Sequence, residues 1–405
     1  MQRTNVIQLM LNRKQEKILR ECMLLSSCVY NSANYIVRQE FFNKESVSNF
    51  RDLQVKLQKT DDYKLLGRSY ALPRLQIYGE TNSARFKLIK SKTQERVGLP
   101  SYFKNRKTNT TIPSYLVIDG CQYSLSKTKV TIPLSRMMRK KYDVKQFKIA
   151  YNGILKHQGK QQRGQIHYKN GKFYLYQSVE VVTPKIVASN NVAGLDLGQK
   201  KYFGILTNTG KELIVGSKRF FRQWQYLTNL IAREQQKLSK INRRTSKNLS
   251  SLFEKRTIYQ DNLFNNIVAK MFRFLKRNQV SKLIIGDLKG IREDNDCGRK
   301  QNQVTHNYWS FDKLLHKIEN KAEEFGIEIQ MSTEEYTSMT CPICGNISEN
   351  NKKDRIFICS DCGYIDHRDI IGARNIMFNG MHDLSNRSVH WHEIMPLEVL
   401  QNGIC

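Results

Sequence analysis

The stretch CSDCGYIDHRDIIGARNI, residues 359–376, begins with a metal-binding pattern and continues into a helical one. Cys359 and Cys362 have the Cys-x-x-Cys spacing, and 14 residues separate them from a second such pair, Cys341 and Cys344. A knuckle of this kind turns sharply, so its two sulfur atoms face one point, and two knuckles complete a tetrahedron of thiolates. The sequence therefore predicts a structural Zn²⁺ site with four protein ligands and no position open for water.

Three aspartates outside the cysteine pairs lie where buried elements are expected to begin or end. Asp369 starts the helical pattern, Asp196 lies in the apolar strand GLDLG, and Asp287 ends the apolar run KLIIGD. A helix dipole or a turn explains each one taken alone, but an ionised carboxylate on a buried strand is costly without a metal or a donor. Together such acids suit a two-metal phosphoryl-transfer site, because Mg²⁺ prefers oxygen ligands.

The overall charge of the chain indicates a polyanionic partner. The 405 residues include 67 Lys and Arg against 36 Asp and Glu, a formal net charge of +31. Such an excess repels itself unless a polyanion neutralises it, and nucleic acid is the first candidate. No apolar run approaches the roughly 20 residues of a membrane span, and the start shows no signal peptide. We therefore expect no membrane partner and a cytoplasmic, nucleoid-associated location.

The pattern of apolar residues divides the chain into a β-rich and helical first part and an α/β second part. The run NVIQLM predicts a short first strand, and Ile18, Cys22, Leu25, Val29 and Ala33 then recur at helical spacings of three and four. The β-rich region that follows contains KNGK, a two-residue hairpin signal. From residue 191 onward, strands alternate with helices, which is typical of an α/β domain.

Several motifs in the second part resemble those of the transposon-encoded TnpB family in type and in order. They are GLDLG, LIIGDLKGIR, WSFDKLLHKIENKAEEFGIEI, YTSMTCPICG and CGYIDHRDIIGARNI. The same motifs resemble the eukaryotic Fanzor proteins and the type V CRISPR nucleases related to TnpB. The resemblance covers residues 191–378 and extends loosely to the N-terminus through GLPSYFKNRK.

The resemblance implies a multidomain α+β fold. Residues 1–12 and 93–190 would form a wedge-type β-barrel that holds a helical recognition domain at 13–92. Residues 191–336 and 364–378 would form an RNase H-like (RuvC) nuclease domain. The zinc ribbon at 337–363, which would bind target nucleic acid, is inserted in that domain. The tail at 379–405 is expected to be poorly ordered.

The resemblance also assigns the catalytic acids and shows one departure. Asp196 corresponds to the first RuvC aspartate and Asp369 to the last. Most members have Glu-Asp-Leu at the end of the second catalytic strand, where this chain has Gly286 in place of the glutamate. In one branch of the family the glutamate stands later, just before YTS, which favours Glu334 here. Strand alternation turns the next residue, Glu335, to the opposite face.

Two other assignments of the third acid stay open. Asp287, directly after Gly286, is an alternative to Glu334, and Glu335 is another. A fourth possibility is that no third acid exists, as in TnpB-like repressors that bind DNA without cutting it.

The resemblance implies an RNA-guided DNA endonuclease encoded by a transposon. Its partners would be a transposon-encoded guide RNA and double-stranded target DNA next to a short adjacent motif. Its cofactors would be two Mg²⁺ ions, or Mn²⁺, bound by Asp196, Glu334 and Asp369, and the structural Zn²⁺. The alternatives are a nuclease-dead guided repressor of the same fold and a zinc-ribbon accessory or RNA-binding protein without guided targeting.

Overall fold

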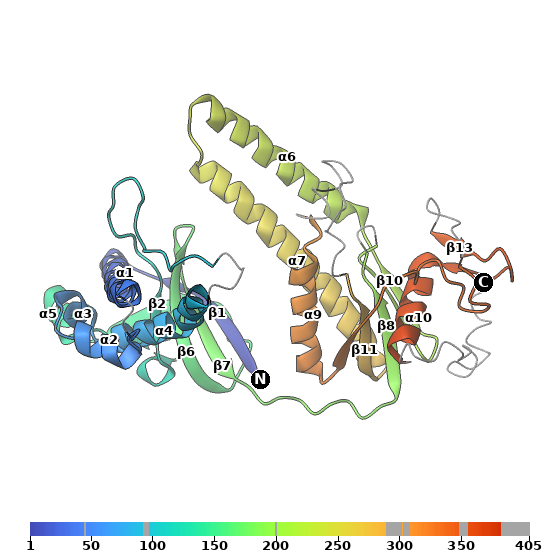
Figure 1. Cartoon of the computed structure of the whole chain (residues 1–405), viewed down its shortest axis with the longest axis horizontal. Helices are drawn as coiled ribbons and strands as arrows, with labels where there is room; N and C mark the ends of the chain where they lie inside the picture. Colours follow the sequence, from blue (N-terminus) through green and yellow to red (C-terminus); the bar gives the residue numbers. More distant parts are fainter. Residues whose placement is uncertain are drawn as a thin grey trace. The chain divides into compact units, whose positions relative to one another are not determined.

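The computed structural model describes residues 1–43, 46–91, 97–198, 201–288, 302, 308–347 and 355–381. The chain forms two compact units, Met1–Val182 and Thr183–Cys405 (Figure 1). Most of the tail for which the sequence predicts poor order, residues 382–405, lies outside the described residues. The last described helix reaches Met381, so residues 379–381 belong to that helix and not to the tail.

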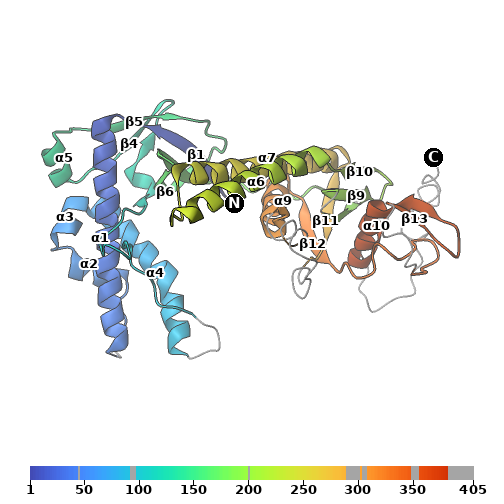
Figure 2. The same cartoon turned by 90° about the horizontal axis from the view of Figure 1, so that it is seen from above.

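The helices of the first unit pack around the long helix α1 (Figure 2). Asn12 and Gln15 form a capping box at the start of α1, which satisfies backbone groups that a helix end leaves without partners. The residues at the predicted helical spacing, from Ile18 to Ala33, are buried along one face of α1, as expected. The helices are α1 (Arg13–Phe42), α2 (Phe50–Leu57), α3 (Asp61–Leu66), α4 (Arg68–Lys90) and α5 (Arg136–Tyr142).

The first unit also contains a seven-stranded antiparallel sheet in the order β2-β6-β7-β1-β5-β4-β3. The predicted KNGK hairpin is present, because Asn170 and Gly171 have positive φ angles between β6 and β7. Strands β2 and β3 lie at the two ends of this order and are not paired with each other in the described residues. Closure of the sheet into a barrel therefore stays a prediction. The strands are β1 (Gln2–Met10), β2 (Leu116–Ile118), β3 (Ser124–Leu125), β4 (Lys129–Ile132), β5 (Phe147–Asn152), β6 (Lys160–Lys169) and β7 (Lys172–Glu180).

The second unit is built on a five-stranded sheet in the order β10-β9-β8-β11-β12. Strand β8 pairs antiparallel with β9 and parallel with β11, and β11 pairs parallel with β12. The carboxyl ends of β8, β11 and β12 therefore lie at one edge of the sheet. The strands are β8 (Asn191–Asp196), β9 (Phe203–Thr207), β10 (Glu212–Val215), β11 (Val280–Gly286) and β12 (Glu328–Ser332).

Helices cover both faces of this sheet (Figure 1). One face packs against α7 and α9 in a large apolar core, and α10 packs on the other face through Ile370, Ala373, Ile376 and Met377. Helices α6 and α7 run side by side (Figure 2). The bounds are α6 (Lys218–Lys240), α7 (Lys247–Arg277), α9 (Phe311–Phe325) and α10 (Arg368–Met381). Among the described residues, no helix is long and apolar enough to cross a membrane.

Two glycines let α10 lie against the backbone of the sheet. A Cβ atom at Gly194 would collide with the carbonyl oxygen of Ala373, and one at Gly204 would lie 2.5 Å from the carbonyl oxygen of Asp369. These positions therefore exclude any side chain. The close approach brings the first turn of α10 over the end of β8.

We expect Gly194→Ala to destabilise the second unit, because its methyl group forces α10 away from β8. Overpacking of this kind costs about 1–3 kcal/mol, which corresponds to a fall in Tm of about 2–10 °C for a unit of this size. Gly98→Ala is the matched control, since a Cβ there meets no atom of the described residues within 4 Å. Thermal unfolding measures both variants, and equal Tm values would contradict the close packing of α10.

Candidate functional site

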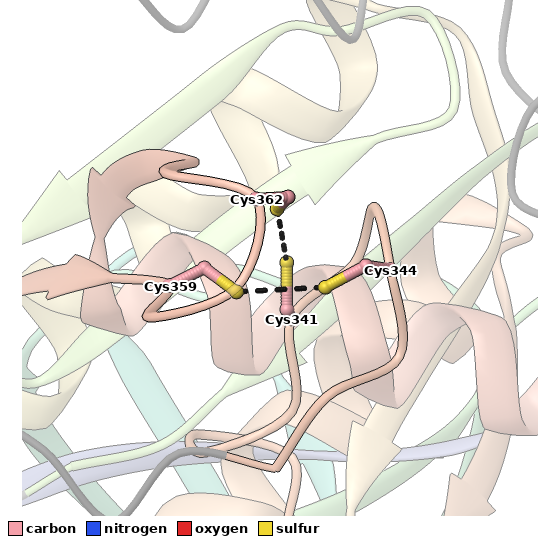
Figure 3. Close-up of side chains that lie close together, drawn as sticks. All are labelled: Cys341, Cys344, Cys359 and Cys362. Carbon is pink, nitrogen blue, oxygen red and sulfur yellow. Dashed lines mark hydrogen bonds between the residues drawn. The ribbon is translucent and has the colours of Figure 1, made fainter.

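The four paired cysteines converge in the ribbon. Their sulfur atoms all lie within 4.8 Å of one another, with 3.6 Å between Cys341 and Cys362 and 3.5 Å between Cys344 and Cys359. Figure 3 shows the sulfur atoms pointing toward a common centre. A tetrahedron with Zn–S bonds of about 2.3 Å has edges of about 3.8 Å, so this arrangement fits Zn²⁺.

The two knuckles have the same local geometry. Each closes with a backbone hydrogen bond, from the amide of Gly345 to the carbonyl oxygen of Cys341 and from Gly363 to Cys359. Both glycines have positive φ angles, 74° and 71°, which explains the glycine after each Cys-x-x-Cys pair. The short hairpin of β13 (Ile356–Ile358) and β14 (Ile365–His367) carries the second knuckle.

Asp196 is the last residue of β8 and lies beneath the first turns of α10. Its partner in the register of β9 is Gly204, and a Cβ atom at Gly372 of α10 would lie 2.5 Å from its Oδ2 atom. Burial, followed by the negative charge of Asp369, raises the pKa of Asp196 to about 7. The carboxylate is therefore in an environment that disfavours its charge unless a cation is nearby.

Glu334 lies two residues beyond the end of β12, and its side chain occupies the space above Gly286. A Cβ atom at Gly286 would collide with the carboxylate of Glu334, so the glycine leaves the room that this carboxylate fills. The Oε1 atom of Glu334 is buried and has no hydrogen-bond partner among the residues that the structure describes. Burial, followed by the charges of Asp196 and Asp287, raises the pKa of Glu334 to about 8.

Asp369 lies in the first turn of α10 and faces a guanidinium group. Nη1 of Arg355 donates to Oδ2 of Asp369 at 2.6 Å, and Nδ1 of His367 lies 3.7 Å from the same oxygen. The charges of Arg355 and Arg368 also act to lower the pKa of Asp196. The site thus combines carboxylates with two arginines.

The two alternative acids have different positions. Glu335 is exposed, and its amide donates to Oγ1 of Thr333. Asp287 follows Gly286, its amide donates to the carbonyl oxygen of Ser332, and its charge acts on Glu334. The structure therefore brings Asp196, Glu334 and Asp369 together at one edge of the sheet, with Asp287 beside them and Glu335 outside.

The three carboxylates match Mg²⁺ in donor type, but among the described residues only the four cysteines have their ligand atoms all within 4.8 Å of one another. Their donors are oxygen atoms, which Mg²⁺ and Mn²⁺ prefer. Asp196 and Glu334 are partly buried, and in the described part of the chain Oε1 of Glu334 has no partner that would compensate its desolvation. A bound cation supplies that compensation.

Sequence reasoning did not identify Arg355 as part of this site. It lies 14 residues before Asp369, on the ribbon, and no motif marks it. Only the folding of the β13–β14 hairpin against α10 brings the two side chains together. The one sequence feature that could have pointed to this contact is the presence of a basic residue shortly before the second Cys-x-x-Cys pair.

Two basic segments present exposed cations. In α5, the exposed residues are Arg136, Arg139, Lys140 and Lys141. Near the tip of the α6–α7 hairpin, they are Arg233, Lys237, Lys240, Arg243, Arg244 and Lys247. Exposed Lys and Arg clusters of this kind neutralise phosphates and release counterions when they bind nucleic acid.

Two protein families match parts of this chain. Residues 174–292 match the family described as "Probable transposase" (OrfB_IS605). Residues 311–376, which include the cysteine pairs and Asp369, match the family described as "Cas12f1-like, TNB domain".

Individual relatives cover more of the chain. The TnpB-like protein ORF457 of Acidianus two-tailed virus is 26% identical over 416 residues, covering 93% of this chain and 86% of that protein. The CRISPR-associated endodeoxyribonuclease Cas12f1 of Syntrophomonas palmitatica is 26% identical over 232 residues, covering 54% and 46% of the two chains. A cryo-EM structure of a Cas12f1–sgRNA–target DNA complex shares the fold, with a TM-score of 0.59, 18% identity, and 91% and 83% coverage.

We expect the purified chain to contain one Zn²⁺ held by the four cysteines. Replacing Cys341 with Ser should remove most of this zinc and loosen the ribbon, because the segment has too small a core to fold without metal. Cys121→Ser is the control, since that cysteine is exposed and lies in the first unit. Metal analysis measures the content, and a wild-type chain without zinc whose four thiols all titrate freely would contradict the site.

Proposed function

Because this chain belongs to the TnpB family, we propose that it is an RNA-guided DNA endonuclease that hydrolyses phosphodiester bonds with divalent metal ions. The observation that carries the proposal is that Asp196, at the carboxyl edge of the sheet, lies within electrostatic reach of both Glu334 and Asp369. Acids from a strand, a loop and a helix are brought there by the fold alone. Such an arrangement suits phosphoryl transfer.

In this proposal, the three carboxylates hold two Mg²⁺ or Mn²⁺ ions. Bound ions of this kind stabilise both the attacking and the leaving oxygen atoms of a phosphodiester. Asp196 supplies a ligand from rigid sheet, and Asp369 supplies one from the N-terminal turn of α10. Arg355 orients the carboxylate of Asp369 through its hydrogen bond.

The proposed nucleic-acid partners are a guide RNA and double-stranded DNA that matches it beside a short adjacent motif. The net charge of +31 and the exposed cations of α5 and of the α6–α7 tip support a polyanionic partner. The resembling Cas12f1 structure is a complex with sgRNA and target DNA, which supports the same class of partner. In guided targeting, base pairing with the RNA supplies the sequence specificity.

We assign the parts of the fold to this function in the same proposal. The second unit would be the RNase H-like nuclease, with the zinc ribbon inserted after β12 contacting target nucleic acid. The antiparallel β8-β9-β10 hairpins followed by parallel β11 and β12 support that assignment. In the first unit, the strands would form the wedge and α1–α4 the recognition domain.

A guided repressor that binds without cutting is the second candidate, because Gly286 replaces the acid on β11. The position of Glu334 favours the nuclease. Its carboxylate lies directly over Gly286, close to where a side chain from β11 would otherwise place its own atoms. In this proposal the acid is supplied from the segment that follows β12 and is not lost.

We expect the protein to cut a plasmid that carries the guide-matched target and its adjacent motif, and only when the guide RNA and Mg²⁺ are present. Cleavage should stop with EDTA, because the carboxylates need the metal to hold the scissile phosphate. The guide is identified by sequencing the RNA that copurifies with the chain. Sequence-specific cutting by RNA-free protein would contradict guided targeting.

We expect Glu334→Ala, Asp196→Ala and Asp369→Ala each to lower cleavage by at least about 100-fold while guided DNA binding persists. Each change removes one metal ligand, which is worth several kcal/mol of transition-state stabilisation. Glu335→Ala is the matched control, and it should cut at nearly the wild-type rate because its side chain is exposed. Plasmid cleavage and DNA binding are measured on the same substrate.

Asp287→Ala separates the remaining assignments. If Asp287 is the third acid, its loss abolishes cleavage while Glu334→Ala still cuts. A wild-type complex that binds the target with Mg²⁺ present and never cuts it would favour the repressor.

A further inference from the structure

The turn that follows Glu334 connects the acidic site directly to the first zinc knuckle. Residues 333–340 separate β12 from Cys341. The carbonyl oxygen of Glu334 accepts hydrogen bonds from both the amide and the Oγ1 atom of Thr337, at 3.3 and 2.9 Å. Tyr336 adopts a positive φ of 56° within the turn, and its carbonyl oxygen accepts from the amide of Thr340. The turn therefore has a specific backbone conformation.

Asn375 of α10 clamps this turn from the side. Its Nδ2 atom donates to the carbonyl oxygen of Thr337 at 2.6 Å and to that of Thr340 at 2.9 Å. Asn375 is 4% exposed and Thr337 is 6% exposed, so the bond between them is buried, whereas the bond to Thr340 is partly buried. Removing the amide leaves buried carbonyl groups without partners, which strongly favours a rearranged turn.

Further contacts join the same helix to the ribbon. Nη2 of Arg368 donates to Oγ of Ser338, within the turn, at 3.1 Å. Ile371 packs against Cys341, Phe357 and Cys359 in a small apolar cluster. The helix that carries Asp369 thus also holds both the turn behind Glu334 and the zinc knuckles.

We propose that Asn375 is a positioning residue for Glu334. In this proposal, the zinc ribbon and α10 together fix the position of the Glu334 carboxylate through the turn at 334–340. The inference rests on the proposed function, in which Glu334 is a metal ligand. A glutamate on β11 would be positioned by the sheet itself. Glu334 lies beyond the end of β12, so the turn must supply the rigidity that the strand no longer gives.

The consequence is that the ribbon also serves the nuclease site. Partners that orient metal ligands typically contribute 10–100-fold to metal affinity. We therefore expect Asn375→Ala to weaken divalent-metal binding at the acidic site by about tenfold or more, while zinc content and guided DNA binding stay unchanged.

The test is affinity cleavage of the full chain in its RNA complex, with Fe²⁺ replacing Mg²⁺, dissolved oxygen as the oxidant, and ascorbate to return Fe³⁺ to Fe²⁺. Radicals formed at the bound iron cut the protein backbone locally, so fragments ending near Asp196, Glu334 and Asp369 report this site alone. The half-saturating Fe²⁺ concentration is compared for wild type, Asn375→Ala, Glu334→Ala and the double variant. If Asn375 acts through Glu334, the double variant binds Fe²⁺ no more weakly than Glu334→Ala.

Two further variants complete the design. Thr337→Val keeps the shape of the side chain but removes the hydroxyl bond to Glu334, and it should shift the half-saturating concentration in the same direction. Asn191→Ala is the matched control, since Nδ2 of Asn191 donates to the carbonyl oxygen of Asn278 at the opposite end of β8. It should leave Fe²⁺ binding at the wild-type level.

Each outcome decides one question. Equal Fe²⁺ affinities of wild type and Asn375→Ala overturn the positioning role. The role is also overturned if the double variant binds Fe²⁺ more weakly than Glu334→Ala by the same factor by which Asn375→Ala binds it more weakly than wild type. If Asn375→Ala loses its zinc, Thr337→Val decides, and the absence of a shift there overturns the role. Wild-type protein that shows no local cutting suppressed by Mg²⁺ contradicts the proposed metal site itself.

Discussion

The close contact between α10 and the central sheet is the constraint on which the second unit depends. Gly194 and Gly204 leave no side chain between the strands and the helix backbone, so the first turn of α10 comes down over the end of β8. This single contact brings Asp369 to Asp196, although 173 residue positions separate them in the sequence. The ribbon packs on the same helix through Ile371, so the cysteines and the acids share one support.

Gathering carboxylates at one buried edge creates an electrostatic cost that the surrounding residues only partly offset. Burial and mutual repulsion raise the pKa values of Asp196 and Glu334, which shows that the fold itself disfavours their charged forms. Arg355 compensates Asp369 by a direct hydrogen bond, but Oε1 of Glu334 has no such partner within the described ranges. Bound divalent cations would offset the remaining electrostatic cost of these carboxylates. A cluster that is unfavourable without such ions points to function and not to stability.

Local patterns in the sequence predicted the local elements, and the non-local contacts lay beyond them. The spacing from Ile18 to Ala33 predicted the buried face of α1, KNGK predicted the β6–β7 hairpin, and KLIIGD predicted strand β11, because each signal lies within one element. The roles of Arg355 and Asn375 depend on pairs of elements that pack together in space. The spacing of apolar residues around Arg355 or Asn375 does not indicate which elements will pack together. Glu334 was indicated by family resemblance and not by residue pattern.

The geometry of the sheet explains how an acid can move from one strand to the next without leaving the site. Strands β11 and β12 are parallel neighbours in which Gly286 pairs with Ser332, so their carboxyl ends lie at the same level. A glutamate two residues beyond Ser332 has enough reach to cross back over β11, provided that position 286 carries no side chain. Gly286 and the position of the Glu334 carboxylate are therefore one structural feature, since a side chain at 286 would occupy the space of the carboxylate. The cost of this arrangement is that Glu334 lies outside the regular strand, so in our proposal its position depends on the turn, on α10 and on the cysteine knuckles.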